Sequence, residues 1–199
     1  VQLEGMLEIP KSAKGIVLFA HGSGSGRHSP RNNYVASVLR ASGIGTLLFD
    51  LLTVEEAEDR ANVFDIDLLA QRLLYATEWI RNNSKTKNLH IGYFGASTGA
   101  AAALKASVVS SANIRAIVSR GGRPDMVGYE LQKVKSPTLL IVGGNDFGVL
   151  ELNKEAYDML HCKKEMKIVP RATHLFEEPG ALEEVARLAS DWFVKHFKD

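Results

Sequence analysis

Short, nearly continuous apolar stretches recur along the chain and are separated by longer segments with helical periodicity. Each stretch is shorter than about ten residues, which favours a buried strand over a helix that is buried on all sides. The predicted strands are residues 15–20, 45–50, 89–94, 114–119, 137–142 and 165–169. Residues 1–10 add an opening strand or hairpin arm.

Helical spacing of apolar residues fills the intervals between these strands. Asp65 is a suitable N-cap for the longest such segment, which we expect to run to about Asn82 with its apolar residues on one face. Gly43 suits the position just after a helix. Further helices are expected in residues 33–42, from residue 100 onward, in residues 126–134 and 150–160, and from about residue 179 to the C-terminus.

The alternation of strands and helices predicts the α/β fold class. Parallel strands need crossover connections, which are right-handed in nearly all proteins. We therefore expect a doubly wound, mostly parallel sheet with helices on both faces. Residues 1–199 contain no repeat, linker or low-complexity tract, so one domain is expected. Ligands of such sheets bind beyond the carboxyl ends of the strands.

Composition and charge exclude some classes of function. Hydrophobic residues make up 45% of the chain, and the formal charge of +1 comes from 24 basic and 23 acidic residues with no basic block, so no nucleic-acid partner is expected. The single cysteine, Cys162, permits no intrachain disulfide. No apolar run is long enough to cross a bilayer and no signal peptide is recognisable. A cytoplasmic location is the default expectation, although the chain starts at Val1 rather than at Met.

Residues 95–99 place a serine, Ser97, between a predicted strand and a predicted helix in the pattern G-x-S-x-G. The flanking small residues allow neighbouring chain to come close, so that the hydroxyl projects from the edge of the sheet. The N-terminus of the following helix directs amide dipoles at any oxyanion formed there. The alternative is an ordinary tight turn in which Ser97 caps the helix.

Candidate catalytic side chains follow several of the predicted strands. They are His21, Asp50, Ser97, Arg120, Asp146 and His174. A serine is a poor nucleophile at its ordinary pKa, so acyl transfer needs a histidine that takes its proton and a carboxylate that orients the histidine. The chain order Ser97, Asp146, His174 fits this chemistry. We expect Ser97 to be the nucleophile, Asp146 the acid and His174 the general base.

Several of these side chains have alternative interpretations. Asp146 could cap the helix at 150–160, and His174 could be a surface histidine. Asp50 is the rival acid, for which we favour a structural role. Arg120 either pairs with Asp125 or another acidic loop residue, or faces the pocket as a substrate-binding residue that favours substrates with a carboxylate.

Two other patterns in the sequence bear on different kinds of chemistry. Residues 21–27 contain three glycines, but they lack the Lys-Ser/Thr ending of a P-loop and the spacing G-x-G-x-x-G, which argues against a dinucleotide site. His21 is expected to bond within this loop. The acidic residues between 55 and 59 raise a glycosidase alternative. No aromatic residue that could stack on a sugar lies in that run, so a solvated loop or short helix is favoured.

In combination, the motifs resemble those of the α/β-hydrolases and, within them, of the small lid-less dienelactone-hydrolase-like enzymes. The matching segments are residues 21–24, 95–99, 143–146 and 172–174, which together span nearly the whole chain. The resemblance implies an α/β-hydrolase fold, and no insertion between the strands at 114–119 and 137–142 is large enough for a cap domain. It also implies an oxyanion hole built from the backbone amides of Thr98 and Ser23. Dienelactone hydrolases carry a cysteine nucleophile, and the serine found here shifts the expected substrate towards simple esters.

The sequence thus predicts a serine hydrolase that cleaves small carboxylic esters, with lactones as a further substrate class, through an acyl-enzyme. The alternatives are an acyltransferase with the same triad and a non-catalytic ligand-binding module on the same fold. The expected partner is a small-molecule ester. We expect no metal, no other cofactor, no nucleic acid and no membrane, and a homodimer is compatible with the sequence.

Overall fold

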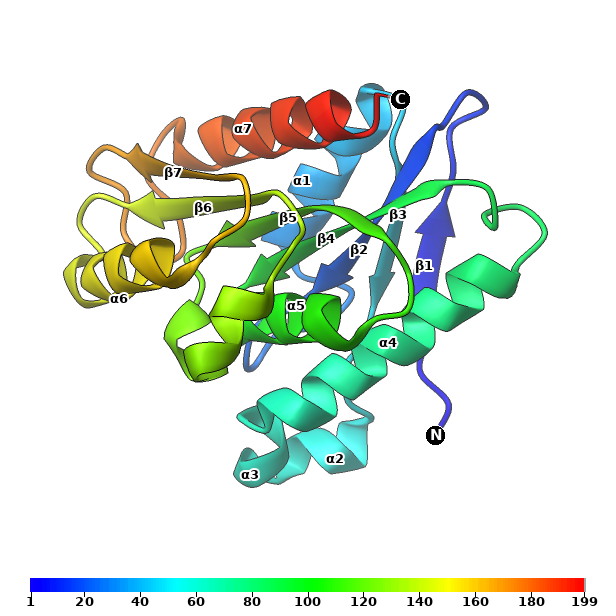
Figure 1. The fold of residues 1–199 in the computed structure, drawn as a ribbon, viewed down its shortest axis with the longest axis horizontal. Helices are drawn as coiled ribbons and strands as arrows, with labels where there is room; N and C mark the ends of the chain where they lie inside the picture. The colour runs from blue at the N-terminus through cyan, green and yellow to red at the C-terminus, as the bar shows by residue number, and fades with distance from the viewer. Residues whose placement is uncertain (199) are drawn as a thin grey trace.

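A seven-stranded sheet forms the centre of the molecule (Figure 1). The computed structural model describes residues 1–198. The strands are β1 (Gly5–Glu8), β2 (Gly15–Ala20), β3 (Gly45–Phe49), β4 (His90–Ala96), β5 (Ile114–Arg120), β6 (Thr138–Gly143) and β7 (Lys164–Val169). They lie in the order β1-β3-β2-β4-β5-β6-β7, with β1 antiparallel to β3 and all other neighbours parallel. The predicted mostly parallel sheet is confirmed.

Helices cover both faces of this sheet. They are α1 (Pro30–Ala41), α2 (Val54–Glu58), α3 (Arg60–Val63), α4 (Ile66–Asn82), α5 (Thr98–Val109), the 3-10 segment η1 (Pro124–Lys133), α6 (Phe147–Met159) and α7 (Ala181–His196). α1 and α7 pack on one face, and α4, α5, η1 and α6 cover the other (Figure 1). Between β5 and β6 the chain forms only η1, so no cap domain interrupts this connection. Within residues 1–198, no helix is long and apolar enough to cross a membrane.

The two faces of the sheet explain why its central strands are apolar throughout. In β2, Ile16 and Leu18 belong to the core beneath α4 and α5, whereas Val17 and Phe19 belong to the core beneath α1 and α7. Successive side chains of a strand point to opposite faces, so a strand with helices on both sides needs apolar residues at every position.

Helix boundaries follow their capping residues. Asp65 accepts a hydrogen bond from Leu68 N–H (3.0 Å), which confirms it as the N-cap of α4. The prediction for α1 was wrong at its start, because the helix begins at Pro30 rather than at residue 33. Ser29 caps it by accepting from Asn32 N–H (3.3 Å), and proline is well suited to the first helical position because it needs no intrahelical acceptor.

Glycines let α5 pack closely against the sheet. A Cβ atom at Gly95 would lie 2.4 Å from Ala100 Cα, and one at Gly99 would lie 2.1 Å from Ala20 O. Neither position can hold a larger residue without movement of the backbone. The first turn of α5 is therefore pressed against the carboxyl ends of β2 and β4.

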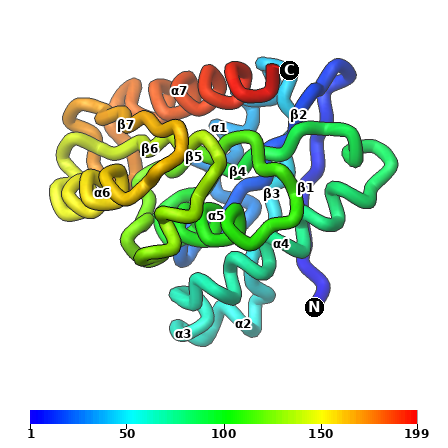
Figure 2. The backbone as a smooth tube through the Cα atoms, viewed as in Figure 1, coloured from blue at the N-terminus to red at the C-terminus, as the bar shows by residue number. Residues whose placement is uncertain are grey.

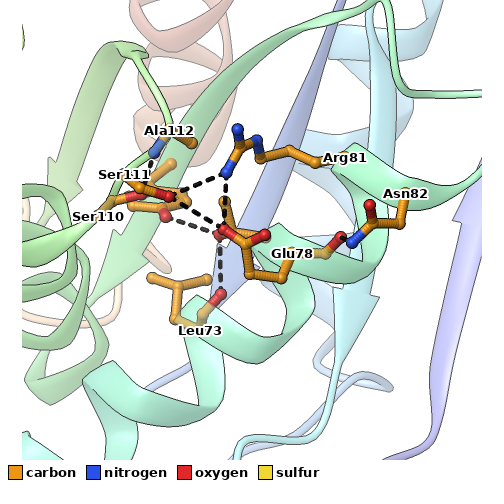
Figure 3. A network of polar contacts seen from close by, with 9 residues as sticks. Leu73, Glu78, Arg81, Asn82, Ser110, Ser111 and Ala112 are labelled. Carbon is orange, nitrogen blue, oxygen red and sulfur yellow. Dashed lines mark hydrogen bonds and ion pairs between the residues drawn. The ribbon is translucent and has the colours of Figure 1, made fainter.

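The opposite edge of the sheet, where the parallel strands begin, carries a polar network (Figure 3). Glu78 Oε1, on α4, accepts hydrogen bonds from Arg81 (2.9 Å) and from the hydroxyl of Ser111 (3.3 Å), which lies between α5 and β5. Arg81 also donates to Ser111 (2.9 Å). These contacts join the last turns of α4 to the connection that leads into β5.

Candidate active site

Ser97 occupies the sharp turn between β4 and α5. Its φ of 52° and ψ of −122° lie outside the regions that non-glycine residues commonly adopt. Such a conformation costs about 1–3 kcal/mol and persists only where its surroundings hold it. Here Ser97 N–H donates to Arg120 O (3.3 Å), and Ser97 O accepts from Arg123 N–H (3.1 Å). Among the described residues the Ser97 hydroxyl makes no capping bond to α5, so the alternative of a capping serine is not the arrangement found.

Asp146 and His174 form a hydrogen-bonded pair. Asp146 directly precedes α6, and His174 lies in the loop between β7 and α7. His174 Nδ1 lies 2.7 Å from Asp146 Oδ2. An ionised carboxylate only accepts hydrogen bonds, so Nδ1 carries the proton and Nε2 is left as an acceptor in the neutral ring. Asp146 stands at the N-cap position, but within residues 1–198 its side chain makes no capping bond.

The His174 pair lies at the same edge of the sheet as Ser97. The turns after β4, β6 and β7 all follow the carboxyl ends of parallel strands (Figure 2). Gly121, which follows β5 beside Ser97, would place a Cβ atom 3.5 Å from His174 Cε1. Ser97, Asp146 and His174 therefore follow the carboxyl ends of β4, β6 and β7, and β5 lies between β4 and β6.

Backbone strain is concentrated at this edge. In the described part of the chain, the non-glycine residues with positive φ are Ser97 (52°), Arg171 (63°) and Phe176 (55°). The last two lie in the loop that carries His174. Strained residues of this kind tend to cluster at functional sites, which supports a functional interpretation of the two loops.

The glycine loop, residues 21–29, lies against Ser97 and borders a cavity. A Cβ atom at Gly22 would lie 3.1 Å from Ser97 Cβ, so the loop passes directly beside the serine. Ser23 and Thr98, the predicted oxyanion-hole residues, both line a cavity of about 720 Å³. Thr98 is the first residue of α5, so its amide has no acceptor within the helix.

The wall of this cavity includes the N-terminal arm, which sequence reasoning did not assign to the site. Residues 2–4 and α2 line it, together with apolar side chains from several elements. The apolar lining residues are Leu3, Leu52, Val54, Ala57, Val63 and Leu69. For the acidic run at 55–59, the sequence predicts a solvated loop or a short helix. Residues 55–58 lie in the short helix α2. The sequence signal that one side of this helix faces inward is the presence of small apolar residues among its charges.

His21 makes a hydrogen bond within its own loop, as predicted, and a second one to Leu51. Its Nε2 accepts a hydrogen bond from Leu51 N–H (3.0 Å), so Nδ1 carries the proton and donates to Gly22 O (2.9 Å). Burial lowers the pKa of His21, while the bond to Gly22 O and the carboxylate of Asp50 act in the opposite direction. Both ring nitrogens are engaged, which argues against His21 as a second base.

Asp50, the rival acid, binds an arginine. Its Oδ1 accepts from Arg27 N–H (2.7 Å), and its Oδ2 accepts from the Arg27 guanidinium. The structural role favoured for Asp50 from the sequence agrees with these contacts.

Arg120 lies beneath the His174 loop. It is 7% exposed, its Nη2 approaches Asn32 Oδ1 at 3.5 Å, and its guanidinium carbon lies 6.0 Å from the centre of the Phe176 ring. Burial lowers the pKa of Arg120 to about 10, and the nearby Arg31 cation acts in the same direction. The side chain therefore stays cationic at neutral pH.

The structure excludes one of the contacts predicted for Arg120 and leaves another open. A pair with Asp125 was wrong, because Asp125 binds Arg123 instead (2.8 Å). Within the described residues, Arg120 does not line the 720 Å³ cavity, and neither do Ser97, Asp146 and His174; the cavity reaches the site at Thr98, the residue after Ser97. A direct contact between Arg120 and a substrate stays a prediction.

Comparison with curated proteins gives one close relative in two strains. The chain is 59% identical over 196 residues to a protein of Mycobacterium tuberculosis that is provisionally named a phosphoribosyl transferase. The match covers 98% of this chain but 44% of that protein. The chain thus spans less than half the length of the curated relatives it matches. No family model matches the chain.

Solved structures give the family. The crystal structure of a dienelactone hydrolase from Anabaena variabilis is 56% identical and superposes with a TM-score of 0.95, covering 98% of this chain and 93% of that one. A lid-less α/β serine hydrolase from Xanthomonas campestris, 18% identical, shares the fold with a TM-score of 0.78 over 97% of this chain and 88% of its own. The high identity to the Anabaena protein, over nearly the full length of both chains, goes beyond a shared fold. The chain therefore belongs to the α/β-hydrolase superfamily, in the group of lid-less, dienelactone-hydrolase-like proteins.

Proposed function

We propose that the chain is a serine hydrolase that cleaves small carboxylic esters through an acyl-enzyme on Ser97. The observation that carries this proposal is the 2.7 Å bond between Asp146 and His174 at the sheet edge where Ser97 is held at a φ of 52°. A strained serine, an imidazole with a free acceptor nitrogen and a carboxylate that orients it are the parts that acyl transfer requires.

Each residue has a role in the proposed reaction. Ser97 Oγ bonds to the ester carbonyl carbon while His174 Nε2 takes the hydroxyl proton. The bond to the leaving alcohol then breaks as His174 returns that proton to the alcohol oxygen. Water attacks the acyl group on Ser97, with His174 again as base, and releases the acid. Asp146 keeps the proton on Nδ1 and stabilises the imidazolium.

The backbone amides of Ser23 and Thr98 are proposed to stabilise the oxyanion. The α5 N-terminus adds its dipole to the Thr98 amide, because α5 begins at that residue. Donors that are already in place when negative charge develops lower the barrier without reorganisation, and loss of one such donor costs about 10²–10³ in kcat.

The cavity supports small, largely apolar ester groups as substrates. Its apolar wall is made of aliphatic side chains, and α2 and α3 cover it instead of a cap domain. A volume of about 720 Å³ lies within the range of small-molecule sites, about 300–1,000 Å³. Lactones carry the same reacting group as esters and form a further substrate class. The Anabaena protein is named for dienelactones. For this chain we propose simple esters ahead of dienelactones, because its proposed nucleophile is a serine.

The name of the curated relatives describes another reaction, transfer of a phosphoribosyl group. That name belongs to a protein of which the match covers 44%, so the greater part of it has no counterpart here. A serine activated by a histidine and a carboxylate serves acyl chemistry. We therefore assign ester cleavage to this chain. Acyl transfer to an alcohol, amine or peroxide would use the same triad, and product analysis with a competing nucleophile separates it from hydrolysis.

Hydrolysis of p-nitrophenyl acetate and butyrate by the wild type and Ser97→Ala tests the proposal. Removal of the nucleophile is expected to lower turnover on the order of a million-fold if the triad acts as a unit. A fluorophosphonate probe should label the wild type at Ser97 and leave the variant unlabelled. An inactive, unlabelled wild type would favour a non-catalytic ligand-binding module. A Ser97→Ala variant that keeps more than about a tenth of the activity would exclude Ser97 as nucleophile.

A further inference from the structure

Asp50 attaches the glycine loop to the central sheet. It directly follows β3 and binds both the backbone N–H of Arg27 (2.7 Å) and the guanidinium of the same residue. A Cβ atom at Gly26 would lie 2.8 Å from Asp50 Oδ1, so a side chain there would push the carboxylate out of place. The loop and Asp50 are thus fitted to each other at two consecutive residues.

Hydrogen bonds hold the glycine loop on both sides of Arg27. Asn33 Nδ2 donates to Arg27 O (2.8 Å), and Ser29 N–H donates to Gly26 O (3.0 Å). Ser25 N–H donates to Gly22 O (3.3 Å), which closes the turn that contains Ser23. Only Gly26 separates this turn from Arg27 along the chain, so we expect a shift of Arg27 to move the Ser23 amide.

The Arg27 guanidinium also binds the N-terminal arm, the segment before β1. A second carboxylate, that of Glu4, binds the same guanidinium. Glu4 O in turn accepts a hydrogen bond from Asp50 N–H (3.0 Å). The Arg27 and Asp50 side chains are only 23% and 26% exposed, so water screens their ion pair less than it screens a surface pair.

Among residues 1–198, the hydrogen-bond partners of the Asp50 carboxylate belong to Arg27 and offer no proton transfer. The neighbouring histidine, His21, uses Nε2 for Leu51 N–H and Nδ1 for Gly22 O. A guanidinium keeps its protons throughout the working range of an enzyme. The contacts of Asp50 can therefore fix geometry, and they offer no route for a proton.

We propose that Asp50 and Arg27 are positioning residues that hold the Ser23 amide at the oxyanion of the transition state. This inference rests on the proposed ester hydrolysis. The oxyanion contact strengthens as charge develops on the carbonyl oxygen, so misplacing the amide weakens the transition state more than the bound substrate. The expected result of loosening the loop is a lower kcat with little change in KM.

Asp50→Asn, Asp50→Ala and Arg27→Met test the proposal with p-nitrophenyl butyrate. We expect kcat to fall about 10- to 100-fold for Asp50→Ala and Arg27→Met, since a displacement of about 1 Å can cost 10²-fold, while KM changes by less than about threefold. Asp50→Asn, which keeps an acceptor for Arg27 N–H, should lose less. Arg27→Lys, which keeps the charge, should recover part of the loss.

Inhibition by phenylboronic acid separates positioning from a general loss of structure. Its adduct with Ser97 is tetrahedral and mimics the transition state, so its inhibition constant should rise in parallel with the fall in kcat. The matched control is Asp191→Asn, which breaks another Asp–Arg pair, with Arg187 (2.9 Å), on the surface of α7. This control should leave kcat and the inhibition constant unchanged.

The outcomes distinguish the inference from the function on which it rests. If the wild type is active and Asp50→Ala and Arg27→Met leave kcat and boronate inhibition unchanged, or raise only KM, the positioning role is wrong. Equal losses in Asp191→Asn would also overturn it. A wild type with no turnover and no boronate inhibition would overturn the proposed function, and the inference with it.

Discussion

Two carboxylates at the same edge of the sheet meet different partners on either side of Ser97. Asp146 follows β6 and binds the imidazole of His174. Asp50 follows β3 and binds the guanidinium and backbone amide of Arg27. Both are aspartates at the end of a parallel strand, Asp50 directly after β3 and Asp146 three residues after the end of β6, so sequence position alone makes each a candidate for the catalytic acid.

The partner decides which role each carboxylate can have. An imidazole gains and loses a proton near neutral pH, and a carboxylate on one nitrogen controls what the other nitrogen can do. A guanidinium stays protonated, so its carboxylate can only hold it in place. The pair on the β6 side of Ser97, Asp146 and His174, can therefore transfer protons. The pair on the β3 side, Asp50 and Arg27, fixes the position of the glycine loop.

Asp146→Asn is expected to have the largest effect among changes to the two carboxylates. The amide can present its NH₂ group to Nδ1 and favour the wrong tautomer of His174, which in serine triads lowers kcat by about 10⁴. The fall in kcat should exceed that of Asp50→Asn by at least about tenfold, measured with p-nitrophenyl butyrate at several pH values. Equal losses, or a greater loss in Asp50→Asn, would reverse the roles assigned to the two sides.

Arg120→Met tests whether the buried cation between the two sides contacts substrate. Arg120 is 7% exposed and lies under Phe176, so we expect kcat/KM to fall by about tenfold or less through movement of the His174 loop. The loss should be the same for p-nitrophenyl butyrate and for the mono-p-nitrophenyl ester of succinic acid, which adds a carboxylate. A direct charged contact contributes about 1.5–3 kcal/mol, so a loss confined to the succinate ester by tenfold or more would place Arg120 in the pocket.

His21 is expected to make the free energy of unfolding depend on pH on the acid side of neutrality. Burial lowers its pKa in the folded protein, so below about pH 6.5 the unfolded chain binds a proton more readily than the folded one. Stability is therefore fully present above that pH and is lost as the pH falls towards the folded-state pKa, with a slope of at most about 1.4 kcal/mol per pH unit from one group. Urea unfolding between pH 7.5 and 5 should show a smaller loss for His21→Asn than for the wild type.

The control for His21 is His161→Asn, at an exposed position outside the site. Its acid-side loss of stability should match that of the wild type. If His21→Asn loses as much stability as the wild type over the same range, the neutral state of His21 does not contribute to holding Leu51 and the glycine loop.

Most of the fold was predictable because its signals are local. Asp65 and the apolar spacing after it gave both ends of α4, and the continuous apolar run at 15–20 gave β2. The start of α1 was misplaced because residues 28–31 look like a loop until Ser29 is recognised as its cap. Capping depends on one side chain and one amide, which is a weaker signal than a run of apolar residues.

The site was predictable where topology alone brings residues together. Parallel strands carry Ser97, Asp146 and His174 to one edge whatever the details of packing, and the chain order then suggests their roles. The packing of loops against one another decides the direction of the Arg120 side chain, the part of the cavity wall formed by residues 2–4, and the bond from Arg27 to Asp50. No short-range pattern records such contacts, so only the structure provides them.

A polar pair inside the core gives the smallest expected effect and separates stability from catalysis. The Tyr93 hydroxyl lies 2.7 Å from Thr77 Oγ1, and because Thr77 already donates to Leu73 O (2.8 Å), Tyr93 is the donor. Burial raises the pKa of Tyr93 to about 12, so it stays protonated in the working range. Tyr93→Phe removes the hydroxyl, which also bonds to the side chain of Ser110, and leaves Thr77 with its bond to Leu73. We expect a loss of about 1 kcal/mol in the free energy of unfolding and an unchanged kcat.

A double-mutant cycle with Thr77→Val measures the interaction between Tyr93 and Thr77 itself. If Tyr93→Phe lowered kcat as much as Asp50→Asn, the effect of Asp50 could be a general loosening of the sheet, and the distinction between the two sides of Ser97 would not hold.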